Sequence, residues 1–462
     1  TWSPDDFALV PGMPPLPGVM GELEDSFVFA HPTASSDGDR VAVFGLLPTL
    51  DDSLDGDQDA WVVAGAWPEE PEEDEPEDDV VGPGLVMEPG EDLEELLADD
   101  EVAQLLAGED GLLFSDGEDD DDDEASPAFW PGGKVYVLDR DGVQVTQAFE
   151  FEDGSPTHIE WTPDDTGLLV LHQEEDHLLL HHVDANAERE PEFLAAGAPI
   201  FWSWQPGGHT LAARLVPPGG GPAQVVLGKP LQGEALQPVA AAGAFYVPAW
   251  HPDGSRLLYS IAGEREDELI LADAAGQRLS RLLSYPGRAA FQWLADGRHV
   301  ALAVAPEGAG PFQLLELLDV DADSSRPLWR GPFLAFLRAP TGVILCLLDA
   351  PTGRIQWLHL DLEGTSRPLG TPFSPAREAL VALHFFEQVG PSHPWLSPDR
   401  RFLVCSGWLT PDTGADATGD EADDDEEITP PEVLITPLDG GPVRSLGPGR
   451  FACFAAPRGA RG

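Results

Sequence analysis

The stretch "AFYVPAWHPDGSRLLYSIAGEREDELILADAAGQRLSRLLS", residues 244–284, contains one complete copy of the unit from which much of this chain is built. Residues 244–250 predict an inner β-strand, and Pro252, Asp253 and Gly254 predict a tight turn after it. Three further strand-length runs follow, "RLLYSIA", "ELILADA" and "QRLSRLLS", separated by the polar loop "GERED" and by a turn at Gly276. The unit is therefore predicted to form four antiparallel strands.

The same unit recurs along the chain with a period in the forties. Its turn comes after four tryptophans at steps of 43, 46 and 43 residues, and weaker copies follow after steps of 44 and 59; these positions are Trp161, Trp204, Trp250, Trp293, Leu337 and Leu396. Four strands in each 40–45 residues are typical of one blade of a β-propeller. We therefore predict an all-β fold, a closed β-propeller of four-stranded antiparallel blades, with seven blades and eight as the alternative.

The repeat resembles a known family of blades. Its tryptophan, Pro-Asp-Gly turn and apolar strand resemble the TolB-type, WD-like propeller repeat over residues 155–462, and "TWSPDDFALV" at residues 1–10 looks like a further copy. The resemblance implies the propeller fold and leaves function open, because such blades serve many roles. The α/β domain that precedes the propeller in TolB is not evident in this sequence.

The tryptophans and the chain ends carry predictions about how the blades pack. Because each tryptophan recurs at the same place in its unit, we expect these side chains to pack between neighbouring blades. The segment "GRFACFAAPRGARG" near the C-terminus resembles another inner strand, which would complete the ring with the N-terminal copy and leave no unpaired strand edge. The predicted domains are blades at 1–67, an acidic insertion at 68–124, and blades at 125–462 that close on the N-terminus.

The charge of the chain limits its partners. Its formal net charge is -60, with 84 Asp and Glu against 24 Lys and Arg, and only two of the basic residues are lysines. Such a surface repels nucleic acid and anionic membranes and favours cations and basic protein surfaces. General adaptation to high salt is a second explanation of the acidity. No window of ~18 apolar residues predicts a membrane span, and we expect a soluble protein of the cytoplasm or the periplasm.

Nearly half of the acidic residues lie in two insertions. Residues 51–124 contain 32 Asp or Glu and no Lys or Arg, and residues 412–427 contain nine acids and no base. Within the first insertion, "EDLEELLADDEVAQLLAGEDG" has a helical stripe of apolar residues that ends at Gly108. One interpretation is a short helix packed on the outside of the propeller, and the other is a docking helix for a partner, with Leu93, Leu97 and Leu105 as the buried contacts.

One acidic segment has the spacing of a metal site. Oxygen-bearing side chains stand at alternate positions around Gly56, as in the calcium loops of FG-GAP propeller repeats; they are Asp51, Ser53, Asp55, Asp57 and Asp59. Val62 occupies the position at which an EF-hand has its glutamate. The segment is interpreted either as a Ca²⁺ loop or as a solvated hairpin loop, and Ca²⁺ is the one cofactor that the sequence suggests.

Histidines and cysteines carry weaker signals. "LHQEEDHLLLHHVD" places His177 and His181 on one face of a strand, but no second segment that would complete a metal site is visible, so polar histidines on a strand face are expected. Cys346, Cys405 and Cys453 each lie in an apolar run and are expected to be small buried hydrophobic residues.

No known catalytic motif occurs in the chain. It contains no G-x-S-x-G elbow, H-E-x-x-H, P-loop or G-x-G-x-x-G ahead of a helix. The leading hypothesis is a non-catalytic propeller scaffold for protein–protein interaction, with a basic partner or as a subunit of a larger assembly. The alternative is a Ca²⁺-dependent propeller hydrolase with its site in the central channel, whose ligands would come from several blades.

Overall fold

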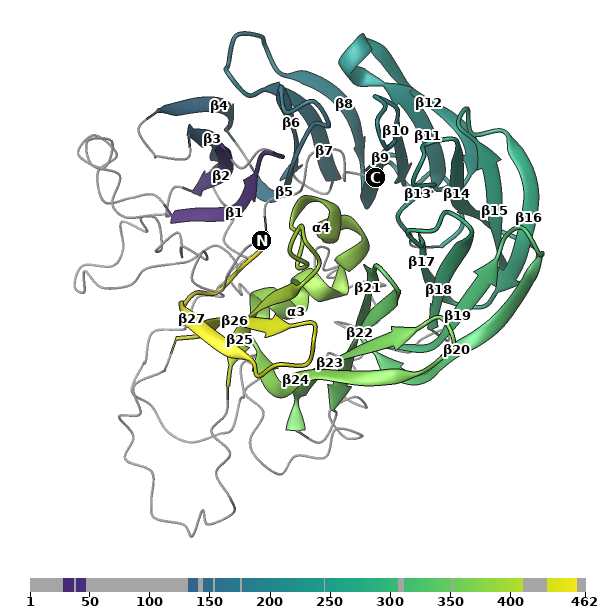
Figure 1. Cartoon of the computed structure of the whole chain (residues 1–462). Helices are drawn as coiled ribbons and strands as arrows, with labels where there is room; N and C mark the ends of the chain where they lie inside the picture. The colour runs from purple at the N-terminus through teal and green to yellow at the C-terminus, as the bar shows by residue number, and fades with distance from the viewer. Residues whose placement is uncertain are drawn as a thin grey trace, which may run out of the picture.

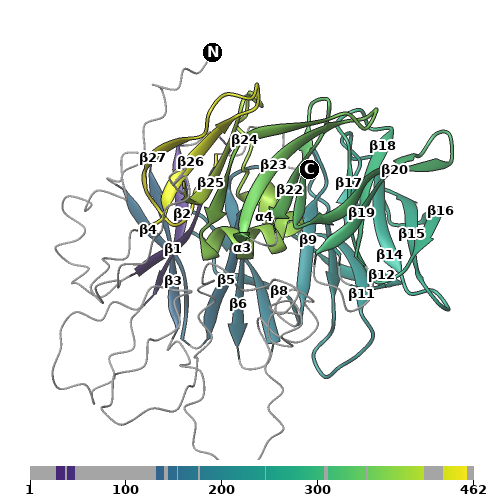
Figure 2. The same cartoon turned by 90° about the horizontal axis from the view of Figure 1, so that it is seen from below.

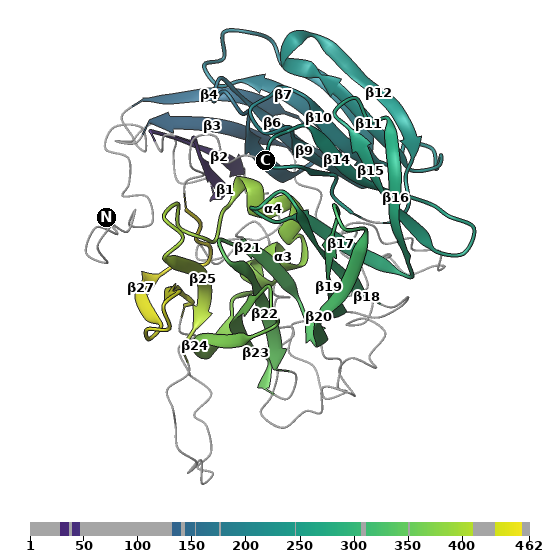
Figure 3. The same ribbon diagram turned by 45° about the vertical axis from the view of Figure 1, so that its right-hand side comes forward.

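The protein is a β-propeller, seen here in a computed structural model (Figure 1). The structure describes residues 28–36, 39–46, 132–139, 144–152, 154–174, 177–244, 246–305, 311–349, 352–409 and 430–454. Antiparallel sheets stand one after another around a central axis, each with its first strand toward the axis and its last strand outside (Figures 1 and 3). The predicted all-β propeller of four-stranded blades is therefore confirmed.

The described strands form five four-stranded sheets and one seven-stranded sheet. The four-stranded sheets are β1–β4 (Val28–Ala34, Arg40–Leu46, Gly133–Asp139, Val145–Phe151), β5–β8 (Ser155–Trp161, Gly167–Glu174, His177–Asp184, Glu192–Gly197), β9–β12 (Ile200–Trp204, Leu211–Leu215, Gln224–Lys229, Glu234–Ala241), β13–β16 (Ala249–Trp250, Arg256–Ile261, Asp267–Asp273, Arg278–Tyr285) and β17–β20 (Arg288–Trp293, His299–Ala305, Phe312–Asp319, Ser324–Phe333). The seven-stranded sheet contains β21–β27 (Ala335–Ala339, Gly342–Asp349, Arg354–Asp361, Ser366–Pro375, Phe402–Trp408, Glu432–Pro437, Arg444–Pro448).

The seven-stranded sheet consists of two blade-like groups. Strands β21–β24 form one complete group, and β24 joins β25 through only two register pairs at its end. Strands β25–β27 have an inner neighbour at Leu396, which forms an isolated bridge to Leu403 of β25. The number of seven blades and the closure of the ring stay predictions. The predicted inner strand at the C-terminus does not form over 450–454, where no strand is assigned.

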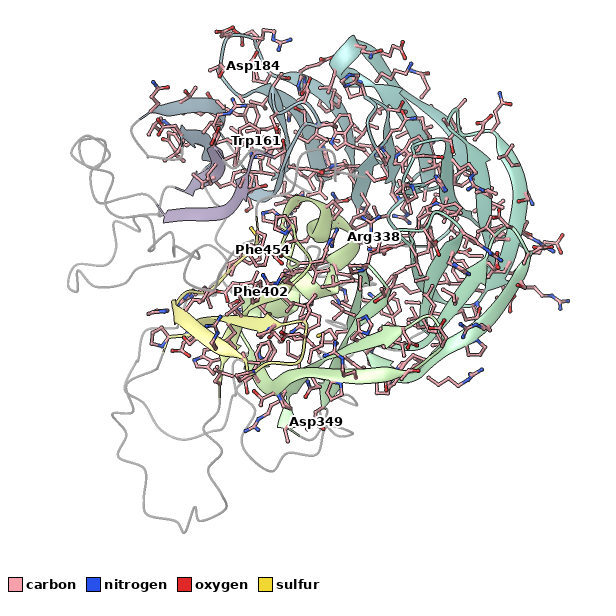
Figure 4. All side chains as sticks on the ribbon, in the orientation of Figure 1. Trp161, Asp184, Arg338, Asp349, Phe402 and Phe454 are labelled. Atoms are coloured by element: carbon pink, nitrogen blue, oxygen red, sulfur yellow. The ribbon has the colours of Figure 1, made fainter. Side chains whose placement is uncertain are left out.

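The tryptophans of the repeat pack between blades, as predicted. The indole N–H of Trp161 on β5 donates to the Thr33 carbonyl of the preceding sheet at 3.0 Å, and that of Trp250 on β13 donates to the Ser203 carbonyl at 3.3 Å. Figure 4 shows Trp161 at the junction of the first two sheets. Trp161, Trp204, Trp250 and Trp293 are all at most 3% exposed. These large buried side chains fix the spacing of neighbouring blades.

Six of the turns that follow an inner segment share one geometry, whereas a tighter turn joins β21 to β22, with Ala339 and Gly342 as register partners. In the six turns, the first residue donates a backbone hydrogen bond to the carbonyl five residues later, at Ser35, Thr162, Gln205, His251, Leu294 and Ser397. In the turn of residues 251–256, Gly254 has φ +73°, a conformation that glycine adopts without strain. The equivalent turns lie on one side of the propeller, which we call the turn face. Connections from the second to the third strand of each blade lie on the opposite side, the insertion face.

Both acidic insertions leave from the insertion face. Leu46 of β2 and Gly133 of β3 are register partners, although residues 47–132 separate them in sequence. Gly407 of β25 and Glu432 of β26 are register partners in the same way. Each insertion therefore replaces a hairpin loop within one blade. The amphipathic segment, the calcium-type loop and both acidic runs lie outside the described residues.

Two helices that the sequence did not predict lie between β24 and Leu396. They are α3 (Arg377–His384) and α4 (Phe386–Ser392). They account for the step of 59 residues between Leu337 and Leu396, to which the insertion at 412–427 cannot contribute because it follows Leu396 in the sequence. No helix in the described part of the chain has the length and apolar character needed to span a bilayer.

Candidate functional site at the axis of the propeller

The helix pair α3–α4 lies at the centre of the ring (Figure 1), and the view from below shows it between the surrounding sheets (Figure 2). A propeller site that draws residues from several blades has to lie here, because only the inner strands approach the axis. The axis is therefore the candidate functional site, and the helix pair provides most of its side chains.

Polar groups of α4 pair with inner strands from several sheets. Gln388 Oε1 accepts from the Trp202 amide of β9 at 2.8 Å, and Glu387 Oε1 accepts from the Phe291 amide of β17 at 3.0 Å. The Ser392 carbonyl accepts from Thr33 Oγ1 of β1 at 3.1 Å. An inner strand has no neighbouring strand on its axial side, so its amides there need another acceptor. Helix α4 supplies acceptors to three sheets at once.

Apolar side chains fix the helix pair in place. Phe386 is 2% exposed and packs edge-on against Phe336 of β21, with ring centroids 5.1 Å apart, and against Phe312 of β19 at 6.3 Å. Phe385 stacks on Phe201 of β9 at 6.5 Å. Burial of large aromatic rings provides most of the free energy of such a contact. The helix pair is therefore part of the hydrophobic core.

A charged cluster lies where α3 meets α4. Arg288 Nη1 of β17 lies 3.5 Å from His384 Nε2 and is the donor, because a guanidinium can only donate. The same guanidinium lies over the Phe312 ring, 4.6 Å from its centroid. Burial, with a smaller effect of Arg288, lowers the pKa of His384 to about 4. Burial raises the pKa of Glu387 to about 8, against the effects of the Phe291 hydrogen bond and Arg288. Glu387 is thus a carboxyl group that titrates near neutral pH.

A second polar group holds the end of α4. Ser392 Oγ lies 3.1 Å from His158 Nε2 of β5 and 2.8 Å from His393 Nδ1, and it also donates toward the Val389 carbonyl at 3.0 Å. A serine between two histidines resembles part of a nucleophilic site. However, Ser392 is 1% exposed, and His158 and His393 are 6% and 2% exposed, so a substrate has no route to the hydroxyl. The group joins the helix to the ring.

On the turn face, the axis carries a buried cation. Arg338 of β21 lies near the axis in Figure 4, and burial together with nearby Arg400 lowers its pKa to about 10. Among the described residues, no three or more His, Cys, Asp or Glu side chains are grouped so that they could hold a metal ion. The axial side chains of the described chain bind the helix pair to the blades, and no catalytic arrangement is visible among them.

The site residues that the sequence suggested fall outside the part of the chain that the structure describes. The calcium-type residues Asp51, Ser53, Asp55, Asp57 and Asp59, and the partner-binding residues Leu93, Leu97 and Leu105, are outside the described residues. Sequence reasoning missed the helix pair, although its apolar residues Ala379, Ala382, Leu383 and Phe386 recur at helical spacing.

The histidine-rich segment forms an aromatic cluster between β4 and the next sheet. His172 of β6 stacks on Phe151 of β4 at 4.7 Å and on His181 of β7 at 5.3 Å, and Phe149 lies 5.2 Å from His181. His172 is 2% exposed and lies inside this aromatic cluster. Burial and nearby His181 lower the pKa of His172 to about 4. This histidine is therefore neutral in the folded protein near neutral pH.

The cysteines agree with expectation in part. Cys346 and Cys405 are free and buried, and Cys453 is free and half-buried. Burial raises the pKa of Cys405 and of Cys453 to about 12, so neither thiol is ionised near neutral pH.

Comparison with known proteins yields likenesses of fold. No family model matches the sequence, and no curated protein matches it. The chain is similar to the crystal structure of TolB from Acinetobacter baumannii, with 16% identity, a TM-score of 0.34, and coverage of 52% of this chain and 60% of that one. The match therefore spans less than two thirds of the length of that TolB chain. It is also similar to a putative TolB from Agrobacterium tumefaciens, with 17% identity, a TM-score of 0.34, and coverage of 49% and 83%.

A third similar structure belongs to a different kind of protein. The β-propeller domain of the Trilobed protease from Pyrococcus furiosus is 12% identical, with a TM-score of 0.34, and the match covers 74% of this chain and 83% of that domain. TolB structures are thus among those similar to the chain, in agreement with the resemblance of its repeats. Fold is all that these likenesses describe.

Proposed function

We propose that this propeller is a non-catalytic scaffold that binds a basic protein partner on its insertion face, as one subunit of a larger assembly. One observation carries the proposal: both acidic insertions replace hairpin loops on the same face, between β2 and β3 and between β25 and β26. Residues 51–124 and 412–427, which belong to these two insertions, together contain 41 acids, 32 and nine, and not a single Lys or Arg.

The electrostatic consequence supports a cationic partner. A face with one sign of charge attracts a partner of the opposite sign and speeds the encounter, and the attraction weakens as salt is added. The apolar stripe of Leu93, Leu97 and Leu105 would then supply burial at the centre of the contact. In this proposal, charge brings the partner to the insertion face and the leucines hold it there.

The packing at the axis supports a scaffold role. Helix pair α3–α4 contacts inner strands of several sheets through Gln388, Glu387 and Phe386, and these contacts hold the blades as one rigid body. A rigid disc presents its loops in a constant arrangement, which lowers the entropy lost when a partner binds.

A basic amphipathic peptide, with Lys and Arg on one helical face and Leu on the other, tests the proposal. Fluorescence anisotropy would compare its affinity for the full chain, for a variant with 68–124 deleted, and for Leu93→Ser/Leu97→Ser/Leu105→Ser. We expect the deletion to weaken binding by at least about tenfold at low salt. The loss of affinity caused by the leucine variant should depend less steeply on salt concentration, because this variant keeps the acidic side chains. A matched acidic peptide is the control and should not bind.

Equal affinity of the full chain and the deletion variant for the basic peptide would contradict the proposal. Leu46 and Gly133 are register partners, and residues 47–67 and 125–132 still connect their strands after the deletion, so the blades should keep their thermal unfolding transition. Loss of that transition would show instead that the segment takes part in folding.

Calcium binding at Asp51, Ser53, Asp55, Asp57 and Asp59 is part of the same proposal and rests on ligand spacing alone. Isothermal titration calorimetry of the full chain with Ca²⁺ would compare it with Asp55→Asn/Asp57→Asn. We expect one high-affinity site that the double variant lacks, on top of weak binding to the remaining acids. Identical titrations for the two proteins would exclude a specific site.

A further inference from the structure

The outermost strands of the propeller divide into two groups by charge. In β16, β20, β24 and β27 there is no Asp, Glu or Lys, although the chain has 84 acids, and there are six exposed arginines: Arg278, Arg281, Arg326, Arg330, Arg367 and Arg444. In β4, β8 and β12 there is no base, and each strand carries one acid, namely Glu150, Glu192 and Glu234. We call the six arginines the arginine rim.

Edge protection explains charge on these strands but not its sign. An outermost strand has an open hydrogen-bonding edge, and proteins protect such edges with charges and prolines. Prolines already stand on β20 and β24 at Pro327, Pro332, Pro368 and Pro372. Either sign of charge would serve, and in this chain acids outnumber bases by 84 to 24. An acid-free, arginine-bearing rim therefore has a further cause.

The rim is only partly neutralised by the described residues. Arg278 and Arg281 share one carboxylate, Glu268 of β15, at 3.4 and 3.2 Å, and Arg367 donates to the Leu438 carbonyl at 2.7 Å. In the described chain, Arg326, Arg330 and Arg444 form no ion pair. Guanidinium groups bind carboxylates with two parallel hydrogen bonds, which suits this rim to an acidic polypeptide.

We propose that the arginine rim is a docking surface for the acidic segment 68–124 of the same chain. The segment has the matching charge, since no Lys or Arg occurs in it. The segment is tethered at both ends: residues 47–67 can extend roughly 70 Å from Leu46, and residues 125–132 roughly 28 Å from Gly133, so its first part has the longer reach. Tethering in one molecule gives a high local concentration. A second copy would have to overcome repulsion between two chains of net charge -60.

Docking on the rim goes beyond the proposed function and does not depend on it. Each exposed ion pair is weak, so docking requires several arginines at once and is lost as salt screens them. If the insertion also binds a basic partner, that partner competes with the arginine rim for the acidic segment. Docking within the chain then raises the partner concentration that is needed for association.

Small-angle scattering and limited digestion with a Glu-specific protease test the proposal on the full chain. The rim variant changes all six arginines to Gln, and the matched control changes Glu150, Glu192 and Glu234 to Gln. In dilute buffer we expect the rim variant to have a larger radius of gyration and to be cut several-fold faster within 68–124 than the native chain and the control. In 0.5 M salt all three proteins should behave alike.

Equal radii and equal cutting rates in dilute buffer would overturn the proposal. A molar mass that rises with concentration in the native chain and not in the rim variant would also overturn it, in favour of contact between copies. The smaller variant Arg326→Gln/Arg330→Gln, with a thermal unfolding curve for each protein, keeps the test valid if the sixfold variant is unstable. No partner protein enters the experiment, so its outcome is separate from that of the proposed function.

Discussion

The inner and outer edges of the blades both have backbone groups without a neighbouring strand, and they differ in how these groups are protected. Inner strands meet α4, whose Gln388 and Glu387 accept backbone hydrogen bonds from Trp202 and Phe291 while Phe386 fills the space between sheets. The outer strands β20 and β24 carry prolines and exposed arginines. At the inner edge, the backbone groups are buried and pair with the helix. At the outer edge, charged side chains and prolines, which lack an N–H donor, oppose pairing with a further strand. Changes at the two edges should therefore differ greatly in cost.

Phe386→Ala gives the largest expected effect. The ring is 2% exposed and contacts two sheets, so its removal leaves a cavity at the axis and should lower the free energy of unfolding by about 3–5 kcal/mol. Urea unfolding measures the loss. Leu279→Ala on β16 is the outer-edge control, since Leu279 is 57% exposed, and it should change the free energy by less than about 0.5 kcal/mol. Similar losses of free energy for both variants would contradict the expected difference between the inner and outer edges.

His172→Phe tests the cluster between the edges. The pKa of His172 falls from 6.5 to about 4 on folding, so the unfolded chain binds the extra proton between these values and the native chain loses stability as pH falls through that window. The loss from this one group is about 3 kcal/mol. Phenylalanine keeps the stacking and removes the titration, so acid unfolding should shift to lower pH while the curves at pH 8 stay close. An unchanged acid midpoint would exclude His172 as a cause.

Glu387→Gln tests the role of the charged cluster at the axis, and its expected effect on the free energy of unfolding is smaller. The pKa of Glu387 rises to about 8 on folding, so its contribution is complete below pH 4.5 and is lost as pH rises through 8. Glutamine keeps the acceptor for the Phe291 amide without the charge. The variant should match the native chain at pH 5 and exceed it by about 1–2 kcal/mol at pH 8.5, because the side chain is not fully buried and solvent reduces the effect. A gain of the same size at both pH values would point to packing instead.

Arg326→Gln/Arg330→Gln should have the smallest effect on folding. Both side chains are exposed on β20, and in the described chain neither forms an ion pair, so the free energy of unfolding should change by less than about 0.5 kcal/mol. Thermal unfolding in dilute buffer provides the measurement. A loss of several degrees would show that the outer edge, too, stabilises the ring.

The blades could be predicted from the sequence because their signal is local and repeated. The tryptophan and Pro-Asp-Gly turn of residues 250–254 recur, and the strands β13–β16 follow the predicted order. Strand β13 is shorter than the predicted run 244–250, because residues 246–248 pair with no strand. The predicted packing of Trp161 and Trp250 between sheets is also confirmed.

The axial site could not be predicted in the same way. Its contacts join α4 to β1, β5, β9 and β17, residues up to 359 positions apart, and nothing in a local window records which strands face the axis. The helices themselves have a signal in "REALVALHFFEQV", residues 377–389, but this segment occurs once and is not part of the repeat. Histidine burial was missed because the cluster forms only when Phe149 and Phe151 come from a different sheet.

Amide hydrogen exchange at Trp202 and Phe291 tests the central claim most directly. The account predicts that these two inner-edge amides, bonded to Gln388 and Glu387, exchange only when the whole ring unfolds, in contrast to the exposed edge amides of β16 and β20. Gln388→Ala should speed exchange at Trp202 and leave Phe291 slow. Exchange at Trp202 and Phe291 as fast as on the outer strands would contradict the claim that the helix pair closes the inner edge.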